Sequence, residues 1–169
     1  MTVRTRATRA ATSALIAGAL LVGTAGCSFL TPTATLNKYD PSDGISSTVG
    51  DVELLNVLAI SSDDDSSLSL MITIVNTSSA SGSLTMQYES SEGERVDISK
   101  PVPSSEVKSY GTEVDGNTIL ISDAGVSAGQ LLPIYFQYGN DSGKELLVPV
   151  ISGENVIYAD LAPANALSE

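Results

Sequence analysis

The chain has 169 residues, with 20 acidic and eight basic side chains, no histidine and a formal net charge of −12 at pH 7. This length is typical of one domain, and the acidic balance excludes a surface that binds nucleic acid by neutralising its phosphates. A single cysteine excludes a framework of internal disulfides.

Residues 1–26 have the pattern of a bacterial export signal. Residues 1–9 contain three arginines and no acidic residue, and residues 10–23 are mostly small or apolar. This run of 14 residues is shorter than the roughly 20 that a membrane-spanning helix needs. We therefore expect a signal peptide that is removed, rather than a permanent transmembrane helix.

Thr24, Ala25 and Gly26 lead directly into Cys27, the only cysteine of the chain. This segment resembles the lipobox of bacterial lipoproteins, with Thr24 where leucine is commoner. The resemblance implies that the signal is cut before Cys27 and that the Cys27 thiol carries diacylglycerol. The protein would then be held by this lipid on the extracytoplasmic face of the cell membrane. The alternative is an ordinary secretory signal in which the cysteine stands by chance.

Residues 27–50 are rich in Thr, Ser, Pro, Asp and Gly and predict a flexible tether between the lipid and the folded domain. Cleavage would remove three of the eight basic residues and none of the 20 acidic ones, which leaves a mature charge of −15. Such a chain is repelled by anionic lipid headgroups and by nucleic acid. Its contact with the membrane is therefore expected through the lipid alone.

Residues 51–161 predict strands and no helix longer than a turn or two. The clearest alternation covers residues 67–75, where the leucines and isoleucines share one face and Met71 points to solvent with the serines. A second alternation over residues 83–89 points Met86 inward. The other predicted strands cover residues 52–60, 95–98, 106–110, 117–121, 131–138 and 145–151.

Short strands separated by turn residues are typical of an antiparallel β-sandwich. The sequence therefore predicts an all-β domain with an immunoglobulin-like or cupredoxin-like fold. Residues 139–143 are expected to form a hairpin loop, and Pro149 favours an edge or a bulge in the last strand. Residues 162–169 show no pattern and are expected to fray.

The segment 128–139 (AGQLLPIYFQYG), followed by ELLVPV at 145–150 and preceded by TIVNT at 73–77, carries a family resemblance. Over about residues 51–151 the chain resembles small actinobacterial lipoproteins of the LpqE type, and more remotely the periplasmic copper chaperones called PCu(A)C. The second resemblance implies a cupredoxin-like sandwich.

The copper chaperones hold Cu(I) with two histidines and several methionines. This chain has no histidine, and only Met71 and Met86 remain after cleavage. Because the alternation points these two side chains to opposite faces, we expect no copper site. Met86 is better interpreted as a core residue.

Asp63, Asp64 and Asp65 stand together between two predicted strands. Carboxylate oxygens are suitable ligands for Ca²⁺, so this run is a candidate for a metal site. The alternative interpretation is a solvated hairpin tip whose charge discourages pairing between edges. No motif in the chain indicates a cofactor.

Catalytic motifs are scarce in the sequence. Histidine is absent, the one thiol is assigned to lipid, and no Gly-x-Ser-x-Gly or Ser-x-x-Lys motif is present. The leading hypothesis is a non-enzymatic binding module that meets a protein partner in the cell envelope. The alternative is a metal-handling envelope protein that binds a hard cation through carboxylates, or a chaperone-like descendant that lost its copper site. A hydrolase or transferase would need two acids that converge in a pocket.

Overall fold

The computed structural model describes residues 11–16, 40, 42–112 and 117–163. The chain divides into two compact units, Met1–Tyr39 and Asp40–Glu169. In the first unit, residues 11–16 are helical and exposed. Within the described ranges, no helix combines the length and the apolar character that a membrane crossing requires.

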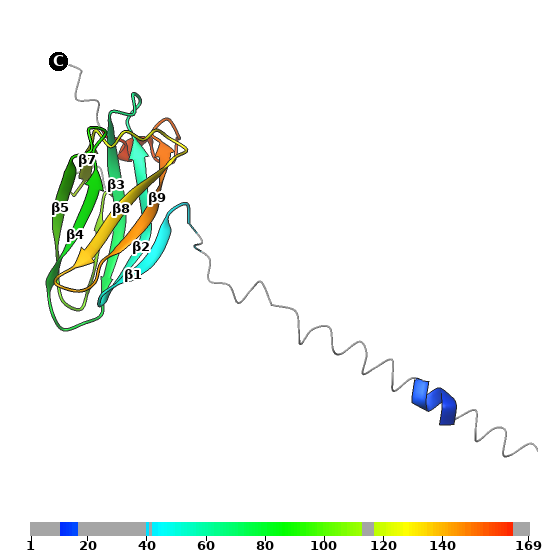
Figure 1. Ribbon diagram of the computed structural model, residues 1–169. Coiled ribbons are helices and arrows are strands. Elements are labelled where there is room, and N and C mark those ends of the chain that lie inside the picture. The colour runs from blue at the N-terminus through cyan, green and yellow to red at the C-terminus, as the bar shows by residue number, and fades with distance from the viewer. Residues whose placement is uncertain (1–10, 17–39, 41, 113–116, 164–169) are drawn as a thin grey trace, which may run out of the picture. The chain divides into compact units, whose positions relative to one another are not determined.

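The second unit is an all-β sandwich, as the sequence predicts (Figure 1). Its described strands are β1 (Ile45–Val49), β2 (Val52–Ser61), β3 (Ser67–Asn76), β4 (Gly82–Glu89), β5 (Arg95–Val102), β6 (Glu106–Tyr110), β7 (Ile119–Ser122), β8 (Leu131–Tyr138) and β9 (Lys144–Ser152). A short 3₁₀ helix, η3 (Ala159–Leu161), follows β9.

The strands form two layers. One layer has the order β5-β4-β8-β9, and the other contains β2, β3 and β6, with β1 against β2 and β7 against β3. The pairs are antiparallel except where Ala59–Ser61 of β2 runs parallel to Val150–Ser152 of β9. This short parallel pairing continues one layer into the other along one side of the sandwich.

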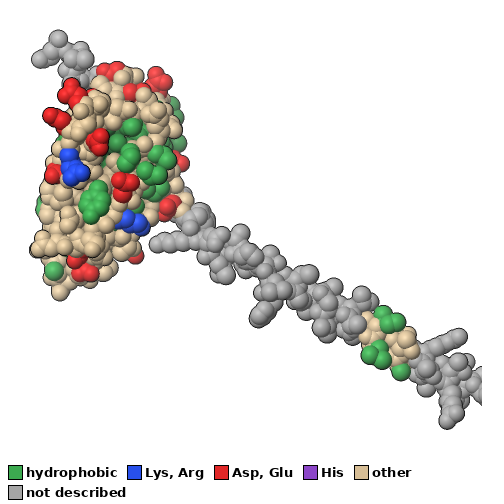
Figure 2. Space-filling model, viewed as in Figure 1, with side chains coloured by type: hydrophobic (Ala, Val, Ile, Leu, Met, Phe, Trp, Pro, Cys, Tyr) green, Lys and Arg blue, Asp and Glu red, His purple; other side chains and the backbone are tan. Residues whose placement is uncertain are grey.

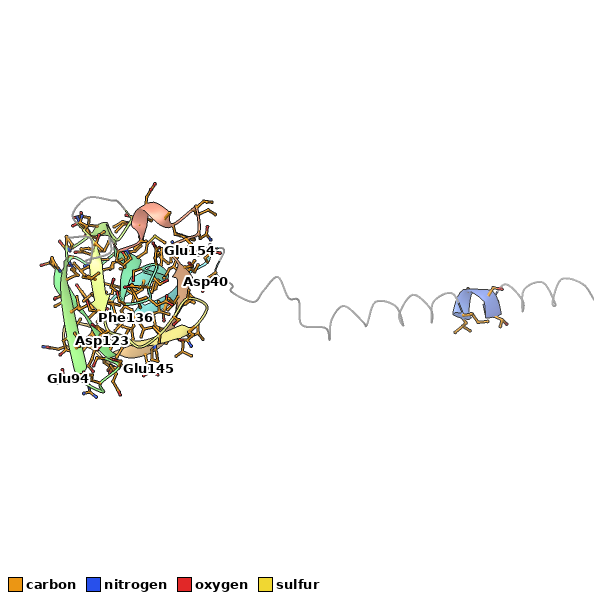
Figure 3. The ribbon with its side chains drawn as sticks, turned by 90° about the horizontal axis from the view of Figure 1, so that it is seen from above. Asp40, Glu94, Asp123, Phe136, Glu145 and Glu154 are labelled. Atoms are coloured by element: carbon orange, nitrogen blue, oxygen red, sulfur yellow. The ribbon has the colours of Figure 1, made fainter. Side chains whose placement is uncertain are left out.

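The core lies between the layers and is built from the inward-pointing residues of each strand, which alternate with outward-pointing ones. Phe136 of β8 is fully buried at its centre (Figure 3), and the exposed fraction of Met86 is 1%. Burial of an apolar side chain of this size contributes roughly 1.5–3 kcal/mol. The inward position predicted for Met86 is therefore confirmed.

The sheet begins earlier than the sequence analysis expects. β1 lies inside the range 27–50 that was assigned to the tether, and it pairs with β2 from Ile45↔Val57 to Val49↔Val52. Its two serines and its threonine give it the composition of a linker, but the serines are half-buried, and Val49 is 2% exposed and belongs to the core. The folded domain therefore starts before residue 51.

Met71 is buried, which contradicts the expectation that it points to solvent with the serines of its strand. Its exposed fraction is 6%, and its register partner Leu58 on β2 is fully buried. Ile60, two residues further along β2, is fully buried as well. β2 and β3 thus bury side chains on both faces, so a second cover, on the face away from the core, must shield Met71, Leu58 and Ile60. The alternation of residues within one strand does not reveal such a cover.

The C-terminal segment 153–163 lies against the outer face of this layer. Its Gly153 N–H donates a 3.1 Å hydrogen bond to the carbonyl oxygen of Ser61 at the end of β2. Further on, the Tyr158 hydroxyl donates a 2.6 Å hydrogen bond to a carboxylate oxygen of Asp43, just before β1. η3 lies on the side of β2 and β3 that faces away from β8 (Figure 3). We therefore assign the second cover of β2 and β3 to this segment.

The start of the tail that was expected to fray belongs to this segment. Residues 162 and 163 are half-buried, and the Ala162 N–H donates to the Tyr158 carbonyl oxygen at 3.1 Å. Residues 164–169 lie outside the described ranges.

Tyrosine hydroxyl groups join the two layers along their open sides. Tyr110 of β6 donates a 2.7 Å hydrogen bond to the carbonyl oxygen of Pro101 on β5. The side-chain amide of Asn76, on β3, donates to the Tyr138 hydroxyl of β8 at 3.2 Å. These contacts link β6 to β5 and β3 to β8 across the sandwich.

Candidate binding site

Four side chains from four neighbouring strands form one row across the outer face of the β5-β4-β8-β9 layer. In the strand registers Asp97 pairs with Gln87, Gln87 with Tyr135, and Tyr135 with Glu145. Because neighbouring strands lie about 4.8 Å apart, this row extends about 14 Å. We call Asp97, Gln87, Tyr135 and Glu145 the outer row.

The outer row points away from the core because its members alternate with buried residues. Tyr135 precedes the fully buried Phe136 and is itself 39% exposed. Figure 3 shows Glu145 on the outside of the layer, away from Phe136. Figure 2 shows this face, where hydrophobic side chains gather among acidic and basic ones.

A glycine holds the Tyr135 ring in place. A Cβ atom added at Gly143 would overlap atoms at the far end of this ring, so the ring lies directly over the Gly143 backbone. A cross-strand aromatic that covers a glycine in this way stabilises the hairpin. One face of the ring is therefore backed by β9, and the other is directed to solvent.

A groove of about 410 Å³ lies beside the outer row. Its lining includes Tyr135 and Pro133 of β8 and, on the opposite side, Ala124 and Val126 of the loop between β7 and β8. Its polar lining comes from Gln87, Glu89, Arg95 and Glu145. We call this hollow the row groove.

The loop that walls the row groove is held by hydrogen bonds at both ends. The Ser91 hydroxyl donates to a carboxylate oxygen of Asp123 at 2.6 Å, and the Ser91 N–H donates to the Asp123 carbonyl at 2.7 Å. At the other end the Ala128 N–H donates to the Asp65 carboxylate at 3.3 Å. The groove thus has a wall positioned by two hairpin turns.

Apolar side chains continue the surface beyond the row groove. Leu131 on β8 and Leu147 on β9 are 53% and 51% exposed. Pro133, two residues after Leu131 on β8, is the register partner of Leu147. Large exposed apolar side chains next to a groove are typical of binding surfaces.

Negative charge predominates around the outer row. Asp97 and Glu145 belong to it. Glu89 lies on β4 two residues after Gln87, and its register partner on β5 is Arg95. A 2.6 Å hydrogen bond from the Gln87 amide to the Asp97 carboxylate fixes two of its members. The surface therefore offers planar hydrogen-bonding groups around one aromatic ring, in a field that disfavours anions.

The residues that the sequence assigns to lipidation lie outside the described ranges. Thr24, Ala25, Gly26 and Cys27 belong to the part of the first unit whose structure is not described. Their assignment stays a prediction from the sequence.

The three aspartates of the β2–β3 hairpin have separate roles. One carboxylate oxygen of Asp64 accepts hydrogen bonds from the Ser62 hydroxyl at 2.7 Å, the Ser66 hydroxyl at 2.7 Å and the Ser66 N–H at 3.0 Å. These bonds, the Ser62 hydroxyl first, lower the pKa of Asp64 to about 2. Asp65 bonds to the loop of the row groove, and Asp63 is exposed.

This geometry is that of a hydrogen-bonded turn. Across the described ranges, no group of three or more acidic or cysteine side chains is placed to hold a metal ion. Asp64 and Asp65 instead organise the hairpin and the adjoining loop.

Sequence reasoning did not single out Tyr135, Gln87, Arg95 or Glu145. The alternation of residues 131–138 already points Tyr135 outward, which was the available signal. Its alignment with Gln87 and Glu145 depends on strand order and register, which a single sequence does not specify.

Comparison with known proteins leaves the family open. No family model and no curated protein sequence matches the chain. Similar solved structures include a copper-bound PCuAC domain from PmoF2, with a TM-score of 0.49 and 11% identity over 64% of this chain and 98% of that one. They also include the apo PCuAC domain from PmoF1, with a TM-score of 0.48 and 10% identity over 64% of this chain and 99% of that one. At this level of similarity neither a ligand nor a function is transferred.

Proposed function

We propose that the chain is an extracytoplasmic lipoprotein whose β-sandwich is a non-enzymatic binding module acting through the outer row and the row groove. The observation that supports binding at this face is the meeting of an ordered aromatic ring, planar polar side chains and exposed leucines beside one hollow. The fold does not need these side chains for its core, since they all lie on the outer face.

The lipid anchor is proposed from the sequence. The arginine-rich start, the apolar run and the lipobox at Thr24–Cys27 support it. The resemblance to small actinobacterial lipoproteins of the LpqE type agrees with the same location. Diacylglycerol supplies two acyl chains, which suffice for stable anchoring.

Cell fractionation with labelled palmitate tests the anchor. The wild-type chain is expected to be in the membrane fraction and to carry the label. The mature Cys27→Ala chain is expected to be absent from the membrane fraction and to carry no label. A mature Cys27→Ala protein that stays membrane-bound would contradict lipidation as the anchor.

Site-specific photocrosslinking in intact cells tests the binding face. A benzophenone side chain replaces Leu147 beside the outer row or, as the control, Leu120 on β7 in the other layer. These two leucines are matched, with exposed fractions of 51% and 53%. Adducts at Leu147 but not at Leu120 are expected, and equal labelling at both positions contradicts the proposed face.

A further inference from the structure

We infer that the outer row is a saccharide-binding site, at which one ring of a neutral or amino-sugar oligomer stacks on Tyr135. The hydroxyl groups of the sugar are bound by the polar side chains beside that ring. This inference rests on the proposed function, because it names the ligand class of the same surface.

Tyr135 provides a stacking platform. One face of its ring is backed by Gly143, which fixes the plane of the ring, and the side chain is 39% exposed. The face of an aromatic ring carries partial negative charge. The C–H groups on one side of a pyranose ring carry partial positive charge and present an apolar surface, so the two faces are complementary.

The polar groups around Tyr135 match hydroxyl groups. A hydroxyl both donates and accepts a hydrogen bond, and the Gln87 amide does the same. Glu145 accepts only, and Arg95 donates only through a planar fork. Gln87 is held in position by its 2.6 Å hydrogen bond to Asp97, which lowers the entropy lost when a ligand binds.

The charges decide which sugars fit. Glu89, Asp97 and Glu145 outweigh Arg95 on this face, and cleavage before Cys27 would leave a chain with an overall charge of −15. A phosphorylated or uronic-acid polymer is repelled. Neutral and amino sugars remain.

The same features disfavour a proline-rich peptide. Grooves that bind such peptides are lined by aromatic side chains, whereas the outer row contains one aromatic ring, Tyr135. Its other three members are polar and planar. A row about 14 Å long across four strands instead suits an extended oligomer that contacts more than one side chain in turn.

Calorimetric titration of the full-length lipoprotein tests the inference. The protein is purified from membranes in a detergent without a sugar headgroup, since such a headgroup would compete. The probes are tetramers of β-1,4-linked N-acetylglucosamine and of β-1,4-linked glucose, with a proline-rich decapeptide in parallel. At least one tetramer is expected to bind, and the decapeptide is not.

Three variants locate the site. Tyr135→Ala is expected to weaken tetramer binding by about tenfold or more. Gly143→Ala keeps the tyrosine but displaces its ring, because the added Cβ overlaps the ring's far end, and it is also expected to weaken binding. Leu120→Ala, in the other layer, should bind as the wild type does. Near-ultraviolet circular dichroism checks that each variant is folded.

The inference is overturned if neither tetramer binds, or if Tyr135→Ala binds the tetramers as tightly as the wild type. Binding of the decapeptide in place of both tetramers assigns the site to a peptide instead. None of these results removes the proposed function as long as Leu147 crosslinks and Leu120 does not. Loss of that contrast removes the proposed function itself.

Discussion

The Tyr88 hydroxyl donates a 3.0 Å hydrogen bond to the carbonyl oxygen of Ser122 and accepts a 3.3 Å hydrogen bond from the Ser122 N–H. Tyr88 lies on β4 in one layer and Ser122 on β7 in the other. One hydroxyl group thus satisfies both backbone groups of a residue at the end of an edge strand, and it joins the layers near the row groove.

Removal of this hydroxyl is expected to destabilise the fold. Tyr88→Phe leaves both backbone groups of Ser122 without this partner and should lower the free energy of unfolding by about 1–2 kcal/mol. Tyr135→Phe removes a hydroxyl from the outer face and serves as the control, with little expected change. Denaturant unfolding of both variants measures the difference, and equal stabilities would contradict the role given to Tyr88.

Asn76 is expected to be the most sensitive polar position among those described. Its side-chain amide donates to the carbonyl oxygens of Ala80 and Pro103, both at 2.9 Å, and its side-chain oxygen accepts from the Ser78 N–H at 3.0 Å. Because the residue is 2% exposed, Asn76→Ala should cost about 3 kcal/mol or more. The same substitution at the exposed Asn140, in the loop between β8 and β9, should change the unfolding free energy by less than about 0.5 kcal/mol.

Replacement of Ser69 is expected to stabilise the protein, in contrast to replacement of Asn76. Its hydroxyl is buried without a hydrogen-bond partner, and the residue is 1% exposed. Ser69→Ala removes a desolvated polar group and should raise the free energy of unfolding by about 1 kcal/mol.

Ser62→Ala is the matched control for Ser69→Ala. Ser62 is equally buried, at 2% exposed, but its hydroxyl donates to Asp64 at 2.7 Å and accepts from the Ser67 N–H at 3.1 Å. This substitution should therefore destabilise the protein. A loss of stability in both variants would show that the Ser69 hydroxyl is satisfied in solution.

The Asp64 turn predicts a pH dependence at the acid end. Hydrogen bonds, chiefly from Ser62, lower the pKa of Asp64 to about 2 from an ordinary value of 3.8. A carboxyl whose pKa is depressed by folding stabilises the fold above its unfolded pKa, and this contribution is lost as the pH falls from about 4 towards 2. An NMR titration of the carboxyl carbon should show the low pKa, and Ser62→Ala should raise it. Titration of the wild-type group near 3.8 would contradict the assignment.

Oxidation of the methionines tests the second cover. Met71 and Met86 are 6% and 1% exposed, so both should react slowly with hydrogen peroxide in the folded protein. Truncation after Gly153 removes the segment with η3 and should accelerate oxidation of Met71 but not of Met86. Mass spectrometry of peptides measures both rates. Rapid oxidation of Met71 in the intact chain would show that its outer face is open.

The all-β fold was predictable because the core strands follow a simple rule. Residues 106–110 and 131–138 were predicted with the bounds that the structure shows for β6 and β8. In β8 each buried residue alternates with a more exposed one. Where one face of a strand is exposed to solvent, apolar and polar residues alternate with a period of two. This pattern predicts both the presence of the strand and which of its faces points to the core.

β2 and β3 departed from this rule for physical reasons. Asn56 adopts a positive φ of 51°, and the β2–β3 register shifts between Leu55 and Leu58. The bulge exchanges the two faces of β2 midway. Met71 was misassigned because its face is covered from outside β3, and the segment to which we assign this cover lies more than 80 residues further along the chain.

The candidate site was less predictable than the fold. Gln87, Tyr135 and Glu145 each point outward from their own strand, and the alternation of apolar and polar residues within each strand predicts this. That the three side chains lie side by side depends on the placement of β8 between β4 and β9. That order arises from a long-range pairing that no local pattern encodes.

The place where the chain enters the domain has a mechanical consequence. A pull along the chain from before Asp40 first loads the turn closed by the 3.0 Å hydrogen bond from the Ser46 N–H to the Asp40 carboxylate. It then reaches β1, a five-residue strand that, among the described strands, forms a ladder with β2 alone. Because β1 is short and lies next to the point where the chain enters, we expect it to detach first under tension. The pairing between β4, β8 and β9 that carries the outer row is expected to stay intact.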